Sequence, residues 1–142
     1  MTRLIGKTVY ADSNVFIYTV EGISPYAQAL RPLFASVAAG ATRVVTSELT
    51  VAEVLVKPLR LADAVLYQAF EDALAAPGVR LVPVSYEVLL RTARLRASGQ
   101  LKTPDAVHAA TAQIAGCDVL LTNDTGIAAV PGVEVVRLAV VA

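Results

Sequence analysis

The sequence predicts an α/β fold, a three-layer α/β/α sandwich around a central parallel sheet. Short apolar stretches rich in Val and Leu alternate along the chain with segments of helical periodicity. Hydrophobic residues make up 56% of the chain, as expected where helices cover both faces of a sheet. The length of 142 residues is typical of one domain. We therefore expect residues 1–142 to form a single domain with right-handed crossovers.

The first half of the chain predicts two strands and four helices. Helix starts are indicated by Ser24 with Pro25 and by Ser47, and Pro58 should break or kink a helix. The helix pair around Pro58 is the least regular part of the pattern. The expected elements are a strand at 8–11, helices at 13–20 and 25–38, a strand at 43–46, a helix after Ser47 and a helix at 61–75.

The second half predicts three strands separated by helices and turns. Pro83 lies inside an apolar stretch, which suggests an edge strand or an early strand end. Ser85 is the expected cap of one helix, and Thr103 is the expected cap of another, with Pro104 at its first helical position. The expected elements are a strand at 79–84, helices at 86–97 and 104–115, a strand at 118–122, a turn at 123–126, a short helical turn at 127–130 and a strand at 133–138.

Composition excludes several classes of protein. No apolar run reaches the roughly 18 residues that a spanning helix needs, and the first residues lack the apolar stretch of a signal peptide. We therefore expect a soluble cytoplasmic protein with no membrane partner. Twelve basic and 12 acidic residues give zero net charge, which argues against nucleic-acid binding driven by bulk charge. A local basic patch remains compatible with this balance.

The scarcity of cysteine and histidine limits the metals that the chain can hold. Cys117 and His108 are the single residues of their types, so no internal disulfide can form. Structural and catalytic zinc sites usually take three or four Cys or His ligands. Any metal held by this chain would therefore be a hard, oxygen-liganded cation such as Mg²⁺ or Mn²⁺.

The stretch VYADSNVFIY organises the prediction. Asp12 follows the first strand directly, and open α/β sheets place their ligands at the carboxyl ends of strands. The alternative is that Asp12 only caps the next helix, although Ser13 and Asn14 can also cap. Asn14 is a further candidate, for orienting a carboxylate or contacting a phosphate. Tyr18 closes the stretch, where core packing is favoured over stacking on a base.

Three other acids are candidates for the same site. Glu53 lies within an otherwise apolar helix, and such a Glu is either solvated or held by a partner or a metal. Asp105, in KTPDAVHAATA, falls in a first helical turn, where the helix dipole alone would explain it. His108 lies on the same helix face, where a structural or supporting role is favoured over a catalytic one.

The fourth acid, Asp124, follows the strand DVLLTN. Turn formation is the alternative explanation, because Asn-Asp before Thr-Gly favours a turn. Thr122, at the strand end, can direct its hydroxyl toward bound water or phosphate. Asp118 stands at the opposite end of that strand, and we interpret it as structural.

Taken together, the four acids predict a metal site. In a parallel sheet, Asp12 and Asp124 would share one edge, and Asp105 would begin a helix leading to it. Crowded carboxylates repel and raise each other's pKa values, and a divalent cation relieves that repulsion. Such a cluster suits phosphodiester hydrolysis, in which the metal activates water and stabilises charge on the phosphoryl oxygens.

A run of basic residues precedes Asp105 without an intervening acid. One interpretation is a phosphate-binding track beside the acids. The alternative is a solvated helix face, paired in part through Glu87 and Arg91 at a spacing of four. The run consists of Arg91, Arg94, Arg96 and Lys102.

The ordered series ADSNVFIY, TSELTVAEVL, KTPDAVHAATA and LLTNDTG resembles the PIN-domain ribonucleases, especially the VapC-type toxins of toxin–antitoxin systems. Each piece alone is weak, but their order and spacing over nearly the whole chain are specific. Ile127 departs from the pattern, since an aromatic residue often follows the last acid. In this resemblance the acidic metal-binding quartet corresponds to Asp12, Glu53, Asp105 and Asp124, and its polar supporting positions to Asn14, Ser47 and Thr122.

The resemblance implies a three-layer PIN-like fold and a Mg²⁺- or Mn²⁺-dependent endoribonuclease, catalysed by the four acids. It also implies a homodimer, an RNA substrate, with transfer RNA as one suggested target, and a cognate antitoxin that occupies the active-site groove. Together these features describe the toxin of a type II toxin–antitoxin system.

Two other functions fit parts of the pattern. A haloacid dehalogenase-type phosphatase also has an Asp after its first strand, but it needs a second acid where this chain has Asn14, and a lysine for which only Lys102 is available. A receiver domain is disfavoured for lack of a suitable acid pair and late lysine. A PIN-like module that binds RNA or protein without cleavage is the non-enzymatic alternative, and it would have been favoured by loss of one acid.

Overall fold

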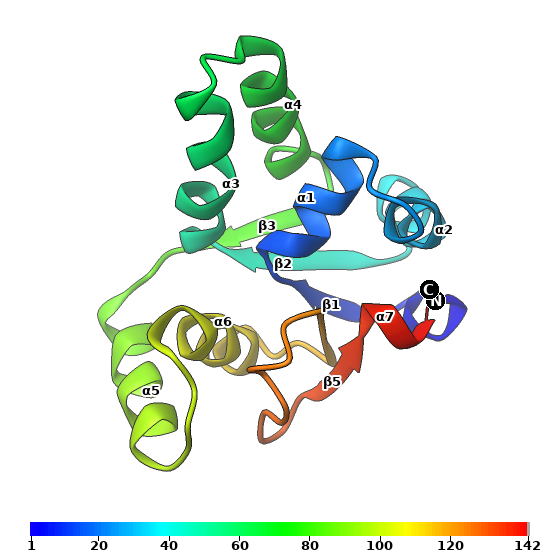
Figure 1. The fold of residues 1–142 in the computed structure, drawn as a ribbon. Helices are drawn as coiled ribbons and strands as arrows, with labels where there is room; N and C mark the ends of the chain where they lie inside the picture. Colours follow the sequence, from blue (N-terminus) through cyan, green and yellow to red (C-terminus); the bar gives the residue numbers. More distant parts are fainter. Residues whose placement is uncertain (142) are drawn as a thin grey trace.

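The computed structural model describes residues 1–141 and has a five-stranded parallel sheet at its centre, which confirms the predicted fold class (Figure 1). Its strand order is β3-β2-β1-β4-β5. The strands are β1 (Thr8–Ala11), β2 (Arg43–Ser47), β3 (Val79–Val82), β4 (Val119–Thr122) and β5 (Glu134–Arg137).

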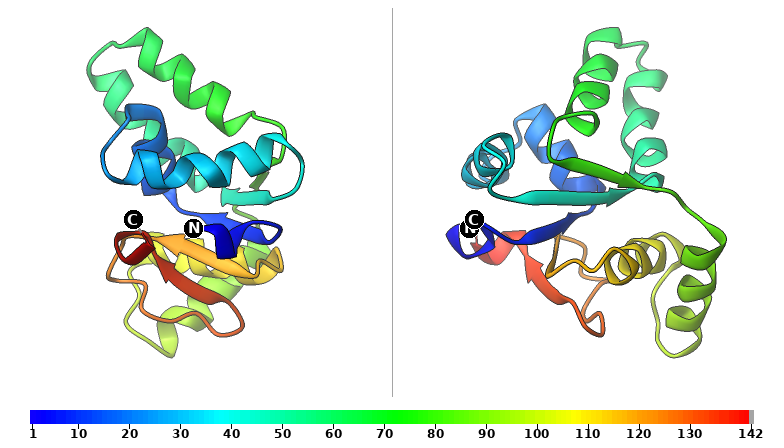
Figure 2. Two further views of the ribbon diagram at one scale, coloured as in Figure 1. Left: turned by 90° about the vertical axis from the view of Figure 1, so that its right-hand side faces the viewer. Right: turned by 180° about the vertical axis from the view of Figure 1, so that it is seen from behind.

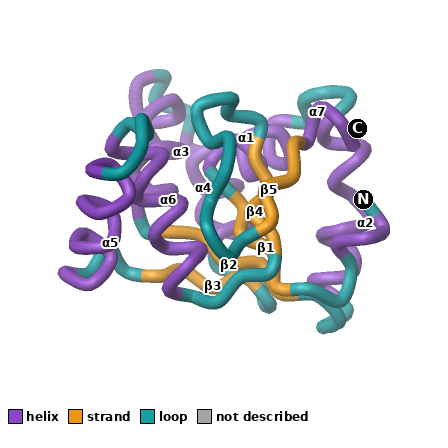
Figure 3. The backbone as a smooth tube through the Cα atoms, turned by 90° about the horizontal axis from the view of Figure 1, so that it is seen from below, coloured by secondary structure: helices purple, strands orange, loops and turns teal. Residues whose placement is uncertain are grey.

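Helices cover both faces of the sheet, and Figure 2 shows them above and below the strands. One layer contains α1 (Ser13–Glu21), α2 (Tyr26–Ala38), α3 (Leu49–Arg60) and α4 (Ala64–Leu74), and the other contains α5 (Tyr86–Ala97) and α6 (Thr103–Ile114). Two short pieces, the 3-10 helix η1 (Thr2–Leu4) and α7 (Leu138–Val141), lie near the chain ends. The view from below in Figure 3 places the strands between the helices.

Alternation along the strands builds two cores. On β1, Val9 and Ala11 pack toward the layer of α1 to α4, whereas Tyr10 packs toward α6. The same alternation separates Leu121 from Leu120 on β4, because successive side chains of a strand point to opposite faces. Helix α6 is buried along most of its length between the sheet and α5, so its polar side chains need partners inside the protein.

Several local predictions are confirmed. Strand β3 is at the sheet edge, as Pro83 suggested, and it ends before that residue. Ser85 caps α5, since its Oγ accepts a hydrogen bond from the amide of Val88 at 3.2 Å. In residues 1–141 no helix is both long and apolar enough to cross a membrane.

Other local predictions are wrong. Ser24 does not cap α2, because its hydroxyl accepts from the Gln28 amide instead and the helix begins at Tyr26. Of the break or kink predicted at Pro58, the break is wrong, because helix α3 continues through this residue to Arg60. Helix α6 begins at Thr103, with Lys102 at the cap position.

The segment after β4 also differs from its prediction. Residues 127–130 form no helical turn, and Val130 instead makes an isolated bridge with Val133. The short helix α7 directly after β5 was not predicted.

Candidate functional site

The site lies where the strand order of the sheet reverses. The chain passes from β1 outward to β2 and β3, and then returns to place β4 on the other side of β1. Crevices at the carboxyl ends of such neighbouring strands are where open α/β sheets bind ligands. Asp12 directly follows β1, and Asp124 lies two residues beyond the end of β4.

Asp12 is buried, with 3% of its surface exposed. One carboxylate oxygen accepts a hydrogen bond from the amide of Val15 at 3.3 Å, so Asp12 does cap α1. The other oxygen accepts a hydrogen bond from the hydroxyl of Thr122, which brings a predicted acid and a predicted supporting residue together. Burial raises the pKa of Asp12, the Thr122 hydrogen bond lowers it, and the charge of Asp124 raises it further.

Asp105 and Asp124 crowd together at the mouth of the crevice. Asp105 lies in the first turn of α6. The Asp124 carboxylate accepts from the amide of Gly126 at 2.7 Å, which closes a turn after β4. Burial and the neighbouring Asp124 carboxylate raise the pKa of Asp105 from 3.8 to about 6. The two acids therefore resist being charged together, as closely spaced carboxylates do.

Gly126 keeps the space between these two carboxylates open. A Cβ atom built at this position would lie 2.8 Å from Asp105 Oδ2 and 3.0 Å from Asp124 Oδ1. The backbone of Gly126 itself thus approaches both carboxylates in a way that no side-chain-bearing residue allows without displacing one of them.

Glu53 lines the same hollow from the opposite layer. The hollow has a volume of about 460 Å³ and is lined by Glu53, Asp105, Asp124 and Lys102, among others. Glu53 extends from the middle of α3, and its Oε1 lies 2.7 Å from Nε2 of His108 on α6. His108 in turn contacts the hydroxyl of Tyr10 through Nδ1 at 2.5 Å.

The remaining supporting candidates lie close by without meeting the acids in one cluster. Asn14 is half-buried in the first turn of α1, two residues after Asp12. Ser47 is buried at the end of β2, where its Oγ accepts from the amide of Leu49 at 3.0 Å and its own amide donates to Tyr10 at 3.1 Å. Ser47 thus contacts the first residue of α3, the helix that carries Glu53, although Glu48 rather than Ser47 occupies the cap position.

The basic run is not gathered into one track. Lys102 lines the hollow with the acids, and Arg96 donates to the backbone oxygen of Leu101 at 3.3 Å. Arg94 is exposed on α5. Arg91 donates to Gln113 at 3.1 Å, which places it near the end of α6 opposite Asp105.

Two further residues shape the site and were missed from the sequence. Arg137, at the end of β5, donates to the backbone oxygens of Asp124 and Ile127, the latter at 2.8 Å. Gly126 leaves room for the carboxylates. For Gly126 the Asn-Asp-Thr-Gly turn was a usable signal, but no pattern links Arg137 to a turn ten or more residues earlier.

The donor set fits a hard divalent cation. Its members are carboxylate oxygens. The carboxylates of Asp105 and Asp124 are already crowded beside Gly126, and the pKa of Asp105 is raised. Within residues 1–141 no three acid, His or Cys side chains are assembled as a ready metal site. Asp12 and Glu53 are instead held by their own hydrogen bonds to Thr122 and His108.

Comparison with known proteins agrees with this geometry. The family model described as "PIN domain" matches residues 9–133. A toxin–antitoxin complex from Klebsiella pneumoniae superposes with a TM-score of 0.70 at 25% identity, over 92% of this chain and 97% of that chain. VapBC-5 from Mycobacterium tuberculosis gives 0.61 at 25% identity, over 92% and 98%.

A third solved structure shows the fold at lower identity. VapBC2 from Rickettsia felis, bound to a DNA fragment from its promoter, gives a TM-score of 0.69 at 16% identity over 92% of this chain and 98% of that chain. The comparison with curated proteins gives no match. With the family model covering most of its length, this chain belongs to the PIN domain family, and among solved structures it is similar to VapC-type members.

Proposed function

We propose that this protein is a Mg²⁺- or Mn²⁺-dependent endoribonuclease, the toxin of a type II toxin–antitoxin system that acts on RNA in the cytoplasm. The observation that carries the proposal is the hollow in which Glu53, Asp105 and Asp124 converge, beside the buried Asp12, where the strand order reverses. Family membership and similarity to toxin–antitoxin structures support it.

In this proposal the four acids hold the cation. When bound, the cation supplies activation of water and stabilisation of negative charge on the phosphoryl oxygens. Asp105 and Asp124 provide the exposed side of the site, and Asp12 provides the buried side, held in place by Thr122. Lys102, on the wall of the hollow, is placed to contact a phosphate of the substrate. Transfer RNA is one candidate substrate.

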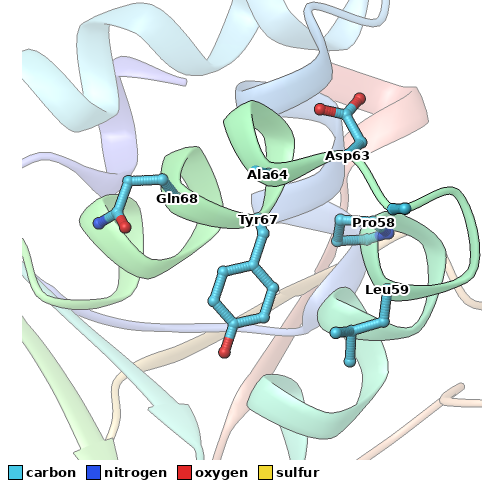
Figure 4. Close-up of a pocket in the computed structure, with 7 residues that line it drawn as sticks. Pro58, Leu59, Asp63, Ala64, Tyr67 and Gln68 are labelled. Atoms are coloured by element: carbon cyan, nitrogen blue, oxygen red, sulfur yellow. The ribbon is translucent and has the colours of Figure 1, made fainter.

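An exposed apolar surface supports a protein partner. Leu59, Leu61 and Val65, around the turn between α3 and α4, are 65%, 63% and 82% exposed. They adjoin a hollow of about 540 Å³ whose wall includes Pro58 and Tyr67 (Figure 4). Exposed apolar patches commonly mark contacts with other proteins. We assign the partners as a cognate antitoxin and a second copy of this chain in a homodimer.

Cleavage of a labelled total-RNA pool tests the function. The purified protein, free of antitoxin, is incubated with Mg²⁺ or Mn²⁺, with EDTA, and in parallel as Asp12→Asn. We expect discrete fragments that disappear in both controls. Absence of cleavage by folded protein with either metal would favour the PIN-like binding module. Cleavage that persists in Asp12→Asn would show that the assigned acids are not the active site.

A further inference from the structure

A buried chain of hydrogen bonds reaches Glu53 from the centre of the sheet. The amide of Ser47 donates to the Tyr10 hydroxyl at 3.1 Å, that hydroxyl contacts Nδ1 of His108 at 2.5 Å, and Nε2 of His108 contacts Glu53 Oε1 at 2.7 Å. Tyr10 is fully buried and His108 is 3% exposed. The chain therefore crosses from β1 and α6 to α3 with little access for water.

The contacts of Tyr10 are consistent with one direction of hydrogen bonding along the chain. Its oxygen accepts from the Ser47 amide, and His108 Nδ1 is the partner that can accept the hydroxyl proton in the buried chain. With Nδ1 as an acceptor, the imidazole carries a proton on Nε2. Nε2 then donates to the carboxylate of Glu53, and the Tyr10 contact favours the tautomer that has its proton on this nitrogen.

This arrangement restricts an otherwise mobile side chain. Glu53 is only partly buried, with 31% of its side chain exposed, whereas the His108 side chain is 4% exposed. A glutamate side chain loses considerable rotamer entropy when it is fixed in one position. The ring of His108 is itself fixed by Tyr10, through both the hydrogen bond and edge-to-face packing at 5.7 Å between ring centroids. One oxygen of Glu53 is thereby tethered, and Oε2 is left for another ligand.

We infer that His108, oriented by Tyr10, is a positioning residue that holds Glu53 ready to bind the divalent cation. This inference rests on the proposed function, in which Glu53 is a metal ligand. Hydrogen-bonded partners of metal ligands commonly change metal affinity or activity by about 10–100-fold when they are removed.

Mn²⁺ binding to the RNA-free protein tests the inference without relying on catalysis. Free Mn²⁺ is followed by electron paramagnetic resonance during titration of wild type, His108→Leu, His108→Gln and Tyr10→Phe. We expect His108→Leu to weaken Mn²⁺ binding by about 10–100-fold. His108→Gln should recover much of the loss, because its amide N–H can replace the Nε2 donor. Tyr10→Phe should fall between wild type and His108→Leu.

Thr111→Val is the matched packing control. Thr111 is also fully buried on α6, but its hydroxyl bonds only to the backbone oxygen of Val107 at 2.6 Å. We expect it to bind Mn²⁺ as wild type does. In cleavage assays, His108→Leu should lower kcat with little change in KM for RNA, because Glu53 acts on the cation rather than on substrate binding.

The results of the Mn²⁺ titrations distinguish failure of the role inferred for His108 from failure of the proposed metal-dependent function. Wild-type affinity in His108→Leu, or a His108→Gln variant no better than His108→Leu, would reduce His108 to a packing residue. A wild-type protein that binds no Mn²⁺ would overturn the metal-dependent function and this role with it. Should His108→Leu fail to fold, ¹⁵N NMR of the wild-type imidazole decides the matter: a proton on Nε2 is expected, and a proton on Nδ1 would contradict the inference.

Discussion

Strand β4 has an aspartate beyond each end, and the two have different surroundings. Asp118, at the amino end, accepts a hydrogen bond from the amide of Thr8 at 2.9 Å and returns one through its own amide, which joins β4 to β1. Asp124, at the carboxyl end, faces Asp105 across the cradle of Gly126. An acid that accepts backbone hydrogen bonds stabilises the fold. Two acids that face each other repel when both are ionised, and a bound positive charge would relieve that repulsion.

The amino end also lacks a reactive thiol. Cys117 is buried beside Asp118, and burial, followed by the charge of Asp118, raises the pKa of the thiol to about 12. A thiol that stays protonated at neutral pH is a poor nucleophile. The contrast favours the carboxyl edge over the amino edge as the place of the proposed chemistry, although acids occur at both edges.

The largest expected effect is on RNA cleavage, and it comes from removing the acid at the carboxyl end of β4 rather than the one at its amino end. Asp124→Asn should lower RNA cleavage by about 100-fold or more, since it removes a carboxylate from the proposed metal site. Asp118→Asn should leave cleavage within about 2-fold, because an amide oxygen can still accept from Thr8. The measurement compares the initial RNA-cleavage rates of the two variants, each normalised to the concentration of folded protein. Equal losses in both would remove the distinction between the two edges.

A smaller effect, on the Mg²⁺ concentration needed for activity, is expected from Gly126→Ala, which keeps both Asp105 and Asp124. The added methyl group would push against Asp105 Oδ2 and Asp124 Oδ1, so the half-saturating Mg²⁺ concentration should rise by about 10-fold. The comparison is Gly99→Ala, whose Cβ would approach only the backbone oxygen of Leu95. Thermal unfolding of both variants checks that each folds. An unchanged Mg²⁺ requirement in Gly126→Ala would mean that the cation does not bind in the space between Gly126 and the two carboxylates.

The smallest effect is a pH dependence of stability without metal. Since the pKa of Asp105 rises from 3.8 to about 6 on folding, the folded chain binds this proton more tightly than the unfolded chain. That contribution to stability is complete below about pH 4 and is lost as the pH rises through 6. In EDTA, the contribution of Asp105 should make wild type melt a few degrees higher at pH 5 than at pH 8.

The same aspartates serve as controls for this pH effect. Asp124→Asn should weaken the dependence by removing the neighbouring charge, and Asp118→Asn should leave it unchanged. Melting curves at a series of pH values in EDTA provide the measurement. A dependence that is the same in Asp124→Asn and wild type would show that the two carboxylates are not coupled.

The fold and the identities of the acids followed from local patterns. The alternation of Val9, Tyr10 and Ala11 is a property of three consecutive residues, and parallel strands bring their ends to one edge whatever connects them. Those rules were enough to place Asp12 and Asp124 at the same edge. They were not enough for Pro58, which lies in the last turn of α3 and is accommodated there without ending the helix.

The contacts that tune the site were beyond sequence patterns. Glu53 meets His108 across 55 residues, and His108 meets Tyr10 across 98. The sequence placed Asp105 and His108 on one helix face but could not show what that face meets. Likewise, the basic run preceding Asp105 has uniform charge in the sequence, yet the turn between α5 and α6 leaves Arg91 beside Gln113 and Lys102 beside the acids.

The hydrogen bonds of Arg137 also bear on how the site is assembled during synthesis. The turn that contains Asp124 accepts hydrogen bonds from the guanidinium of Arg137, at the end of β5. The ribosome adds Arg137 to the chain after all four acids. A nascent chain folds as its segments leave the ribosome, at about 5–20 residues per second. The acids therefore emerge before Arg137, and a chain still lacking β5 holds the turn of Asp124 only by its local hydrogen bonds to Thr122 and Gly126. For the proposed nuclease, we expect this order to delay activity until synthesis has passed Arg137.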